Sequence, residues 1–452
     1  MLGRSLVLLL FAIPLQAKLI RVDPAAPSTD TPVRVMIAAP NPSGCYFVFD
    51  GVDRSGSNIT LRYHGTVCLN TPTSWSDVVP LGLLPAGTFT ISVVVGGSVR
   101  DSYDLFVSDA SAPLKVLPSS KPGRAIEQVQ ISSERELLLC NEAGCVKPTI
   151  IFGGVVVPDR FVTVVDAHTV LASTMPHDAG AVDVTVKTPT QTITAVSAFR
   201  FYAGNAAPDP AIFERILLPI AYNGFGAFSS WWRTDLNIFN ANPVFFSSID
   251  AVRPLFYFRP CLFEACPGYI PAGGSEDALD PLTKSPSGLL LMPQRDLASG
   301  LRFSYRAWEA FQAAKGLSSG TELPIVRERD FRTGKLSLVN VPLDHHSRVA
   351  LRLYGPDSEA MVVTVRVYAA GDPKPAIAQK SVRLDAPACS TDPCDAAFPS
   401  FAVISDLETF FPEISQLDRV RIEVEPVLPY RFWAFVTITN NATQNVTTVT
   451  PQ

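Results

Sequence analysis

Charged residues are scarce in this sequence, and the shortage limits which partners the protein can have. Only 17% of the 452 residues are charged, and the formal net charge is −5. A chain with this balance has no positive field to attract nucleic acid or an anionic lipid surface. We therefore expect no nucleic-acid partner.

Long hydrophobic runs are missing beyond the N-terminus. Residues 6–15 (LVLLLFAIPL) follow Arg4 and precede a small residue, Ala17. This order is typical of a signal peptide over residues 1–17. The run is too short to cross a bilayer, which takes roughly 20 apolar residues. No cysteine follows it for lipid attachment, and the C-terminal VTTVTPQ has no hydrophobic tail. We expect a secreted protein, extracellular or periplasmic, without a transmembrane segment in the mature chain.

Catalytic motifs are also missing. The sequence contains no G-x-S-x-G, H-E-x-x-H, Walker or G-x-G-x-x-G pattern. Only five histidines occur, and the triplet Asp344-His345-His346 lacks the further Asp and His motifs that a two-metal site needs. The acidic stretch 272–280 fits no known calcium loop. We therefore expect no enzymatic activity, no cofactor and no bound metal.

Short strand-like runs separated by turns fill the rest of the chain. Proline is abundant, with 39 residues, and valine, threonine and phenylalanine are frequent. That composition favours short β-strands over helices. The sequence predicts an all-β protein made of tandem immunoglobulin-like β-sandwich modules, with one short helical insertion in the C-terminal region.

Eight cysteines form four pairs that are local in sequence, and three of the pairs enclose four residues each. An even number of near pairs behind a signal peptide favours disulfides over zinc, which remains the alternative. The expected disulfides are Cys45–Cys68, Cys140–Cys145, Cys261–Cys266 and Cys389–Cys394.

Proline-rich linkers suggest where the modules begin and end. Strand-like runs fill residues 18–110, which we predict to be one Ig-like sandwich. The stretch 108–124 (SDASAPLKVLPSSKPGR) is typical of a linker. A second sandwich is expected over 111–204, and NAAPDPA (205–211) precedes a third region.

The second module resembles an IPT/TIG domain, an immunoglobulin-like family, over residues 152–202. It has the Phe-Gly-Gly hairpin at 152–154 and the strand HTVLA at 168–172. It also has GAVDVTV at 180–186 and a closing FRFY at 199–202. The resemblance implies an Ig-like fold in an exported bacterial protein. IPT/TIG modules occur in surface receptors, in adhesion-type proteins and beside carbohydrate-acting domains.

The region 205–452 has several strand-like runs, and we expect two sandwiches, at about 212–330 and 331–452. Runs such as WRTDLNIFNA (232–241), RPLFYFRP (253–260) and RVALRLYG (348–355) predict strands. The stretch 295–316 is expected to be helical in its second half.

Aromatic residues cluster between Tyr222 and Phe258, and this cluster is the strongest functional signal. Adjacent residues of a strand face opposite sides, so of Trp231 and Trp232 we expect one to be buried and one exposed. An exposed tryptophan beside Arg233 and Asp235 can stack on a sugar ring or anchor a partner. The alternative is that the cluster forms a sandwich core. Trp231 and Trp232 are the candidate ligand-binding residues.

These observations favour an exported, non-enzymatic multi-module protein that acts in binding or adhesion at or outside the cell surface. Its expected partner is a protein or a glycan. The alternatives are an array of carbohydrate-binding modules, supported by the aromatic cluster, and a cryptic hydrolase in the C-terminal region.

Overall fold

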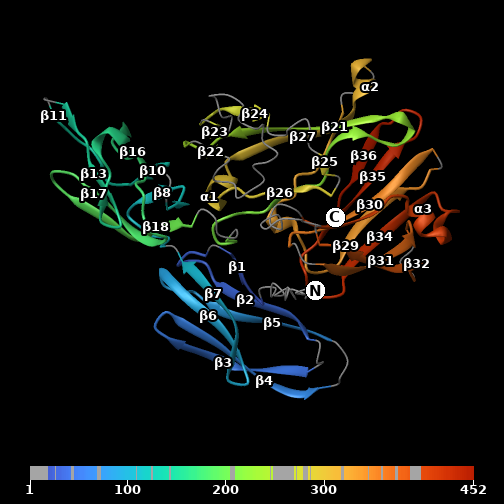
Figure 1. Cartoon of the computed structure of the whole chain (residues 1–452), viewed down its shortest axis with the longest axis horizontal. Coiled ribbons are helices and arrows are strands. Elements are labelled where there is room, and N and C mark those ends of the chain that lie inside the picture. The colour runs from blue at the N-terminus through green and yellow to red at the C-terminus, as the bar shows by residue number, and fades with distance from the viewer. Residues whose placement is uncertain are drawn as a thin grey trace, which may run out of the picture. The chain divides into compact units, whose positions relative to one another are not determined.

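Strands form almost all of the regular structure of this chain (Figure 1). The computed structural model describes residues 19–452 except 26, 42–44, 69–72, 108, 124–125, 142–143, 204–208, 245, 248–268, 271, 278–283, 286, 317–319, 345, 358–359, 372–374 and 387–398. The chain divides into two units. The first comprises Met1–Asp23, Val33–Leu81 and Phe89–Asp104, and the second comprises Pro24–Pro32, Gly82–Thr88 and Leu105–Gln452. The predicted all-β fold is confirmed.

Two sheets hold the N-terminal strands. One contains β1 (Ile20–Asp23), β2 (Val33–Asn41) and β5 (Thr73–Gly82). The other contains β3 (Cys45–Ser55), β4 (Asn58–Cys68), β6 (Gly87–Val95) and β7 (Ser98–Val107), in that order. Every second residue of β6 is buried, as in a strand with one face on a core.

A second pair of sheets follows. The first contains β15 (Val162–Asp166), β16 (Thr169–Ser173), β10 (Gln128–Ser132) and β8 (Lys115–Leu117). The second contains β14 (Val155–Val156), β13 (Thr149–Phe152), β17 (Gly180–Lys187), β18 (Thr192–Tyr202) and β9 (Ser120–Pro122). A short 3-10 helix, η1 (Asp159–Phe161), precedes β15. Phe152, Phe199 and Phe201 lie at the centre of the core that these sheets share.

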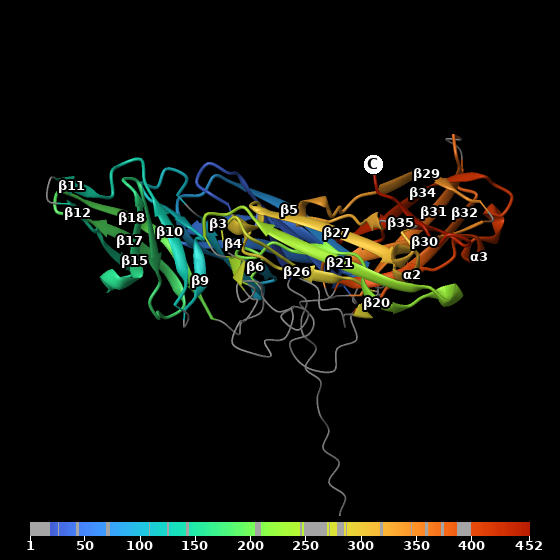
Figure 2. The ribbon, with the colours of Figure 1, turned by 90° about the horizontal axis from the view of Figure 1, so that it is seen from above.

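The middle of the chain forms a sheet around the long pair β21 (Trp231–Asn240) and β27 (Leu301–Glu309), which run side by side (Figure 2). The other strands of this sheet are β20 (Ala221–Phe225), β24 (Ser275–Asp277), β25 (Lys284–Ser285) and β28 (Thr321–Glu322). Two smaller pairs are β19 (Ile216–Leu218) with β26 (Leu289–Leu291), and β22 (Phe246–Ser247) with β23 (Tyr269–Ile270).

The helical prediction for 295–316 is right only at its end. The strand β27 extends to Glu309, and the helix α2 (Ala310–Ala314) is a short continuation of it. A separate turn of helix, α1 (Arg295–Ala298), comes before the strand. Pairing along the whole of β21 overrides the helical tendency of this stretch. The predicted strand at 253–260 lies outside the described residues.

The C-terminal part contains two four-stranded sheets (Figure 1). One has β29 (Leu336–Pro342), β34 (Arg419–Pro426), β31 (Met361–Ala369) and β32 (Ala378–Leu384). The other has β33 (Ser400–Ile404), β30 (Ser347–Gly355), β35 (Trp433–Asn440) and β36 (Val446–Val449). The short helices α3 (Leu407–Phe410) and η5 (Pro412–Ile414) complete this part. The core that the two C-terminal sheets share is almost entirely aliphatic.

A buried carboxylate joins the middle segment to the C-terminal sheets. Glu328, in the 3-10 helix η3 (Glu328–Asp330), contacts Arg215 at 2.9 Å, Arg295 at 2.5 Å and Arg431 at 3.0 Å. Burial would raise the pKa of Glu328, but the three guanidinium groups outweigh it and lower the pKa to about 2. Arg215 also pairs with Asp357 at 2.5 Å. The network is therefore a structural connection between these segments.

Two of the four expected disulfides can be placed by backbone register. Cys45 lies opposite Cys68 on β3 and β4, and Cys140 lies opposite Cys145 on β11 (Leu139–Asn141) and β12 (Gly144–Val146). Opposed Cα atoms in an antiparallel pair are about 4.5–5.5 Å apart, within the range a disulfide spans. The pairs Cys261–Cys266 and Cys389–Cys394 lie outside the described residues, and all four disulfides stay predictions. Within the described ranges, no helix is both long and apolar enough to cross a membrane.

Candidate functional site

The first part of the aromatic cluster lies in the hairpin of β20 and β21, while its members at 245 and 256–258 lie outside the described residues. Phe225 is opposite Trp231 in the register, and their rings meet edge to face at 4.5 Å. The indole N–H of Trp231 donates to Asn223 Oδ1 at 2.9 Å, and the Trp231 backbone N–H donates to the buried carboxylate of Glu309. These contacts hold the end of the hairpin in place. Phe225 is nevertheless 68% exposed, so an aromatic face remains open to solvent.

Trp232 points to the other face of the hairpin and lies against the loop that closes it. Its indole N–H donates to Ser230 Oγ at 3.0 Å. A β-carbon built on Gly226 would lie 2.5 Å from Trp232 Cδ1, so the ring packs directly over this glycine. The loop contains the 3-10 helix η2 (Ala227–Ser229) and closes with a bond from Gly226 N–H to Ser230 O at 2.8 Å. The glycine therefore makes room for the indole.

The strand β30 supplies the opposite wall. Its odd-numbered residues Val349, Leu351 and Leu353 are buried in the C-terminal core. Arg348 and Arg352 alternate with them and therefore share the other face of the strand. On the neighbouring strand β35, Thr439 lies opposite Arg348. The same alternation places Thr437 on that face. Two guanidinium groups and two hydroxyl groups thus occupy one sheet face.

A pocket of about 370 Å³ lies between the hairpin and this face. Aromatic rings line it from Tyr222, Phe225 and Trp232. Its polar groups are arginines and threonines: Arg233, Arg348, Arg352, Thr234, Thr437 and Thr439. Ile220, Ala307 and Leu323 add an apolar part. The cavity therefore combines π faces, hydrogen-bond donors and three cations.

Two buried tyrosines bond to the backbone that leads into β20, beside this pocket: Tyr354 reaches it from β30, and Tyr305 reaches it from β27 in the same sheet as β20. Tyr354 OH donates to Pro219 O at 2.6 Å, and the Tyr305 hydroxyl bonds both the N–H and the carbonyl of Ile220. Burial raises the pKa of Tyr354 to about 12, opposed by the positive charge of Arg352, and burial also raises the pKa of Tyr305. Both phenols are therefore neutral at physiological pH. We regard them as structural groups that set the spacing between the segments.

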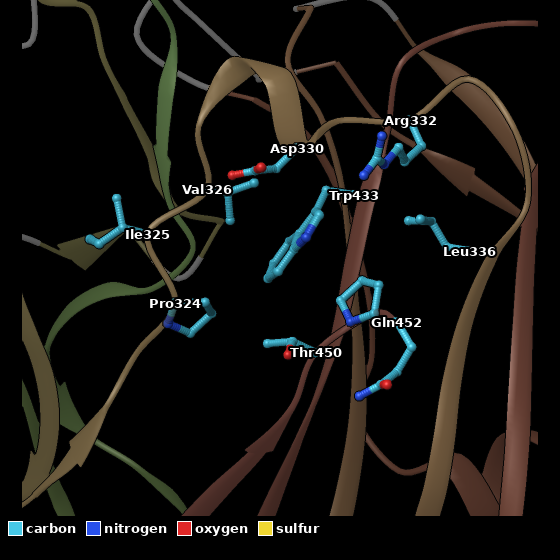
Figure 3. A pocket seen from close by; sticks show the side chains of 10 residues that line it. Pro324, Ile325, Val326, Asp330, Arg332, Leu336, Trp433, Thr450 and Gln452 are labelled. Carbon is cyan, nitrogen blue, oxygen red and sulfur yellow. The ribbon is translucent and has the colours of Figure 1, made fainter. Parts of the chain in front are cut away.

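A second, smaller pocket of about 260 Å³ lies around Trp433. Figure 3 shows the indole at its centre, with Pro324 to one side, Leu336 to the other and Thr450 beneath. Asp330 and Arg332 lie at its upper edge (Figure 3). Trp433 is only 5% exposed and stacks on Phe435 at 5.1 Å. The Trp433 ring packs in the core, so little of its surface is accessible to a ligand in this pocket.

The two tryptophans named from the sequence have different surroundings. The expectation that one would be buried and the other exposed is wrong, because both are half-buried. Trp231 packs on Phe225, whereas Trp232 lines the larger pocket. The neighbouring Arg233 lines this pocket as well and pairs with Asp235 at 2.7 Å.

Sequence reasoning missed Arg348 and Arg352. The available signal was the alternation in RVALRLYG, where two arginines four residues apart share the face opposite the valine and the leucines. That pattern identifies a polar face but not what faces it. Thr437 and Thr439 were missed for the same reason.

Among the residues that the structure describes, groups suited to metal binding or acid–base catalysis do not gather at this site. None of the described residues that line the larger pocket is Asp, Glu or His. Within the described part of the chain, no group of three or more His, Cys, Asp or Glu side chains is placed to hold a metal ion. Asp277, from the acidic stretch, accepts a hydrogen bond from Asn237 at 3.1 Å. The chemistry that this lining supports is recognition through stacking, hydrogen bonds and positive charge.

No family model matches this chain, and no curated protein matches it. Similar solved structures include "SGBP-B from a complex xyloglucan utilization locus in Bacteroides uniformis", at 13% identity and a TM-score of 0.15, covering 95% of this chain and 98% of that one. Another is the Bacteroides ovatus mixed-linkage glucan utilization locus SGBP-B in complex with mixed-linkage heptasaccharide, at 10% identity and a TM-score of 0.19, covering 91% and 94%. A third is the surface glycan-binding protein PbSGBP-B from Prevotella bryantii, at 10% identity and a TM-score of 0.15, covering 94% of each chain. At these identities and TM-scores the likenesses carry no argument about what this chain binds.

Proposed function

We propose that this protein binds carbohydrate, without catalysis, in the pocket between the β20–β21 hairpin and the β30–β35 face. The observation that carries the proposal is the position of Trp232, held at the pocket by Gly226 and Ser230 and accompanied there by Tyr222 and Phe225. Export through the predicted signal peptide would bring this pocket into contact with glycans outside the cell.

Stacking on aromatic rings is the physical basis of the proposal. The C–H groups on one face of a sugar ring contact a π face well, because that face is apolar while the hydroxyl groups point outward. The outward hydroxyl groups then need hydrogen-bond partners. Thr437 and Thr439 can both donate and accept, and the guanidinium groups can donate. The lining of this pocket supplies both requirements.

The size of the pocket agrees with a short stretch of glycan. Its volume of about 370 Å³ lies toward the lower end of ligand pockets, which hold about 300–1,000 Å³. Among the described residues, the lining includes no pair of carboxyl groups of the kind that glycoside hydrolysis ordinarily uses. This supports recognition over cleavage at the site.

Adhesion to a protein partner is the broader function that the sequence suggested, and it remains a second candidate. The feature that favours it is the exposed ring of Phe225, because aromatic residues are enriched at protein interfaces. We prefer a glycan because Trp232 lines a cavity, whereas a protein interface needs a broad surface. The resemblance of 152–202 to IPT/TIG modules is compatible with either partner.

A glycan array followed by calorimetry tests the proposal. We expect the wild-type protein to bind at least one glycan class and Trp232→Ala to weaken that binding by about tenfold or more, or 1.4 kcal/mol. Phe239→Ala is the matched control. Phe239 is exposed on the same strand, does not line the pocket and points to the opposite face from Trp232. Equal affinities of wild type and Trp232→Ala for every glycan bound would sink the proposal.

A further inference from the structure

We infer that the glycan site continues out of the pocket, around the end of the β20–β21 hairpin, and onto the outer face of the same sheet, which is the face that points away from Trp232. The ligand of this extended site is a long polysaccharide chain. The inference rests on the proposed function, because it takes the pocket as the first part of the site. It is carried by Phe225 and Arg233, which line the pocket and also belong to the outer face.

The backbone register assigns residues of the hairpin to the outer face. Phe225 lies opposite Trp231, and Gly224 lies opposite Trp232. Because side chains alternate along a strand, Phe225, Trp231 and Arg233 point away from the face that carries Trp232. The burial pattern of β21 agrees, since its even-numbered residues from 234 to 240 are buried and its odd-numbered residues are exposed or half-buried. The outer face is therefore accessible to a ligand.

The end of the hairpin has a free edge that joins the two faces. Within the described residues, the neighbouring strand β25 pairs with β20 only at Ala221 and Tyr222. The last three residues of β20, 223–225, therefore have a partner strand on one side alone, which is β21. A sugar chain that leaves the pocket can pass around this edge along Phe225, whose ring is 68% exposed.

Two indole rings lie on the outer face beyond this edge. Trp308 on β27 is opposite Arg233, so Trp308 is the diagonal neighbour of Trp231. Diagonal neighbours in an antiparallel pair are about 7–8 Å apart, within reach of large aromatic side chains. The indole N–H of Trp231 already donates to Asn223 Oδ1, so the part of this ring that remains for a ligand is its π face. Both indoles are half-buried, and neither is among the described residues that line the pocket. They form a second stacking surface, separate from that of Trp232.

Polar groups beside the two indoles suit the hydroxyl groups of a sugar chain. Arg233 pairs with Asp235 at 2.7 Å, and the two side chains are 50% and 38% exposed. An exposed pair of this kind contributes little to stability, so its donors and acceptors can exchange to ligand hydroxyl groups. Arg306 lies opposite Asp235, and Ser304 is exposed on the same face of β27. Because charges of both signs alternate here, the face favours a ligand rich in hydroxyl groups over one with charge of a single sign.

The two stacking surfaces are too far apart for a short sugar. Trp232 and Trp231 lie on opposite faces of one sheet, and a sheet with its side chains is about 10 Å thick. A ligand that contacts both must therefore extend about 10 Å beyond the pocket. Each further sugar ring that reaches an indole adds contact area, so affinity should increase with chain length until the outer face is occupied. This dependence on length is the property expected of a polysaccharide site.

A length series of one glycan tests the inference. Calorimetry with the full chain compares oligosaccharides of the class that binds best on the array, from the disaccharide to the octasaccharide. We expect the longest oligomer to bind the wild type about tenfold or more tightly than the shortest oligomer with measurable binding. The readout is the ratio of these two affinities, because damage to the fold or to the pocket weakens both and leaves the ratio unchanged.

Two variants link the gain in affinity to the outer face. Trp231→Ala and Trp308→Ala should each reduce the wild-type ratio by about fivefold. Trp308→Ala is the decisive variant, since Trp231 packs on Phe225, which also lines the pocket. Phe239→Ala is the matched control and should keep the wild-type ratio. Phe239 is 39% exposed on the same face of β21 as Trp231, but it lies eight residues further along the strand, or about 27 Å.

The outcomes separate this inference from the proposed function. If Trp232→Ala weakens every oligomer but the affinity of the wild type does not rise with length, the pocket binds glycan and the extended site is wrong. A rise with length that Trp308→Ala leaves intact also overturns the extended site. If binding of no oligomer depends on Trp232, the proposed function itself fails.

Light scattering tests the other occupant that an aromatic face can have, a second copy of this chain. If the wild type is a dimer and Trp308→Ala is a monomer, the outer face is a contact between copies and the inference is wrong. A monomeric wild type, with a rise in affinity along the length series that Trp308→Ala removes, supports the extended glycan site.

Discussion

Trp232 lies over Gly226 so closely that a β-carbon on the glycine would come within 2.5 Å of the indole Cδ1. The same β-carbon would meet Ser230 Oγ, the acceptor of the indole N–H, at 2.7 Å. Real β-carbons almost never come this close to another heavy atom. Any side chain at position 226 must therefore move the ring that lines the pocket.

Gly226→Ala is predicted to weaken glycan binding by about tenfold while leaving the fold intact, because the displaced indole no longer presents its face to the cavity. Calorimetry with the best glycan from the array measures the loss. Gly334→Ala is the control. A β-carbon at Gly334 would meet nothing within 4 Å, and the backbone φ of Gly334 is not positive. Unchanged affinity in Gly226→Ala would show that the position of Trp232 does not matter.

Glu328→Gln is predicted to destabilise the second unit by about 3 kcal/mol at neutral pH, because three arginines lose the buried charge that they share. The pKa of Glu328 falls from 4.5 to about 2 on folding. This stabilisation is therefore complete above pH 4.5 and disappears as the pH falls toward 2.

Denaturant unfolding at pH 7 and at about pH 3 checks the sign of this effect. The gap in midpoint between wild type and Glu328→Gln should narrow at the lower pH. Glu413→Gln is the control, because the Glu413 carboxylate is exposed. Its unfolding midpoint should stay close to that of the wild type at both pH values. A gap that widens in acid would contradict the assigned role of Glu328.

Peptide mapping without reduction is predicted to recover four local disulfides, Cys45–Cys68, Cys140–Cys145, Cys261–Cys266 and Cys389–Cys394. Backbone register already places the first two pairs opposite one another. Mapping of protein secreted into an oxidising compartment, with thiols blocked before digestion, gives the measurement. Free thiols, bound zinc or a crosslink between different pairs would count against this assignment.

Much of the fold could be predicted because strand periodicity is local. The runs at 232–241 and 348–355 became β21 and β30 with small shifts at their ends. The strand β27 was missed although LRFSYRA alternates apolar and polar residues, because the helix-forming residues that follow it, AFQAAKG, predict a helix in the second half of 295–316. Its strand state depends on pairing with β21, which lies about sixty residues earlier in the chain. Interactions of this kind cannot be read from the segment itself.

The candidate site could be predicted only in part. Trp232 was found because it belongs to a dense aromatic cluster in one short stretch. Arg348 and Arg352 lie more than a hundred residues further on, in a strand whose hydrophobic face dominates its pattern. Alternation shows that these arginines share a face. It does not show that the face meets a hairpin from another sheet.

The two walls of the pocket belong to separate sheets, and this separation has a consequence for how specificity can change. The hairpin contributes rings, and the β30–β35 face contributes charge and hydroxyl groups. Substitutions on one wall leave the backbone pairing of the other untouched. Substitutions at positions 348, 352, 437 or 439 would therefore change the polar groups that face the cavity while the aromatic wall keeps its place.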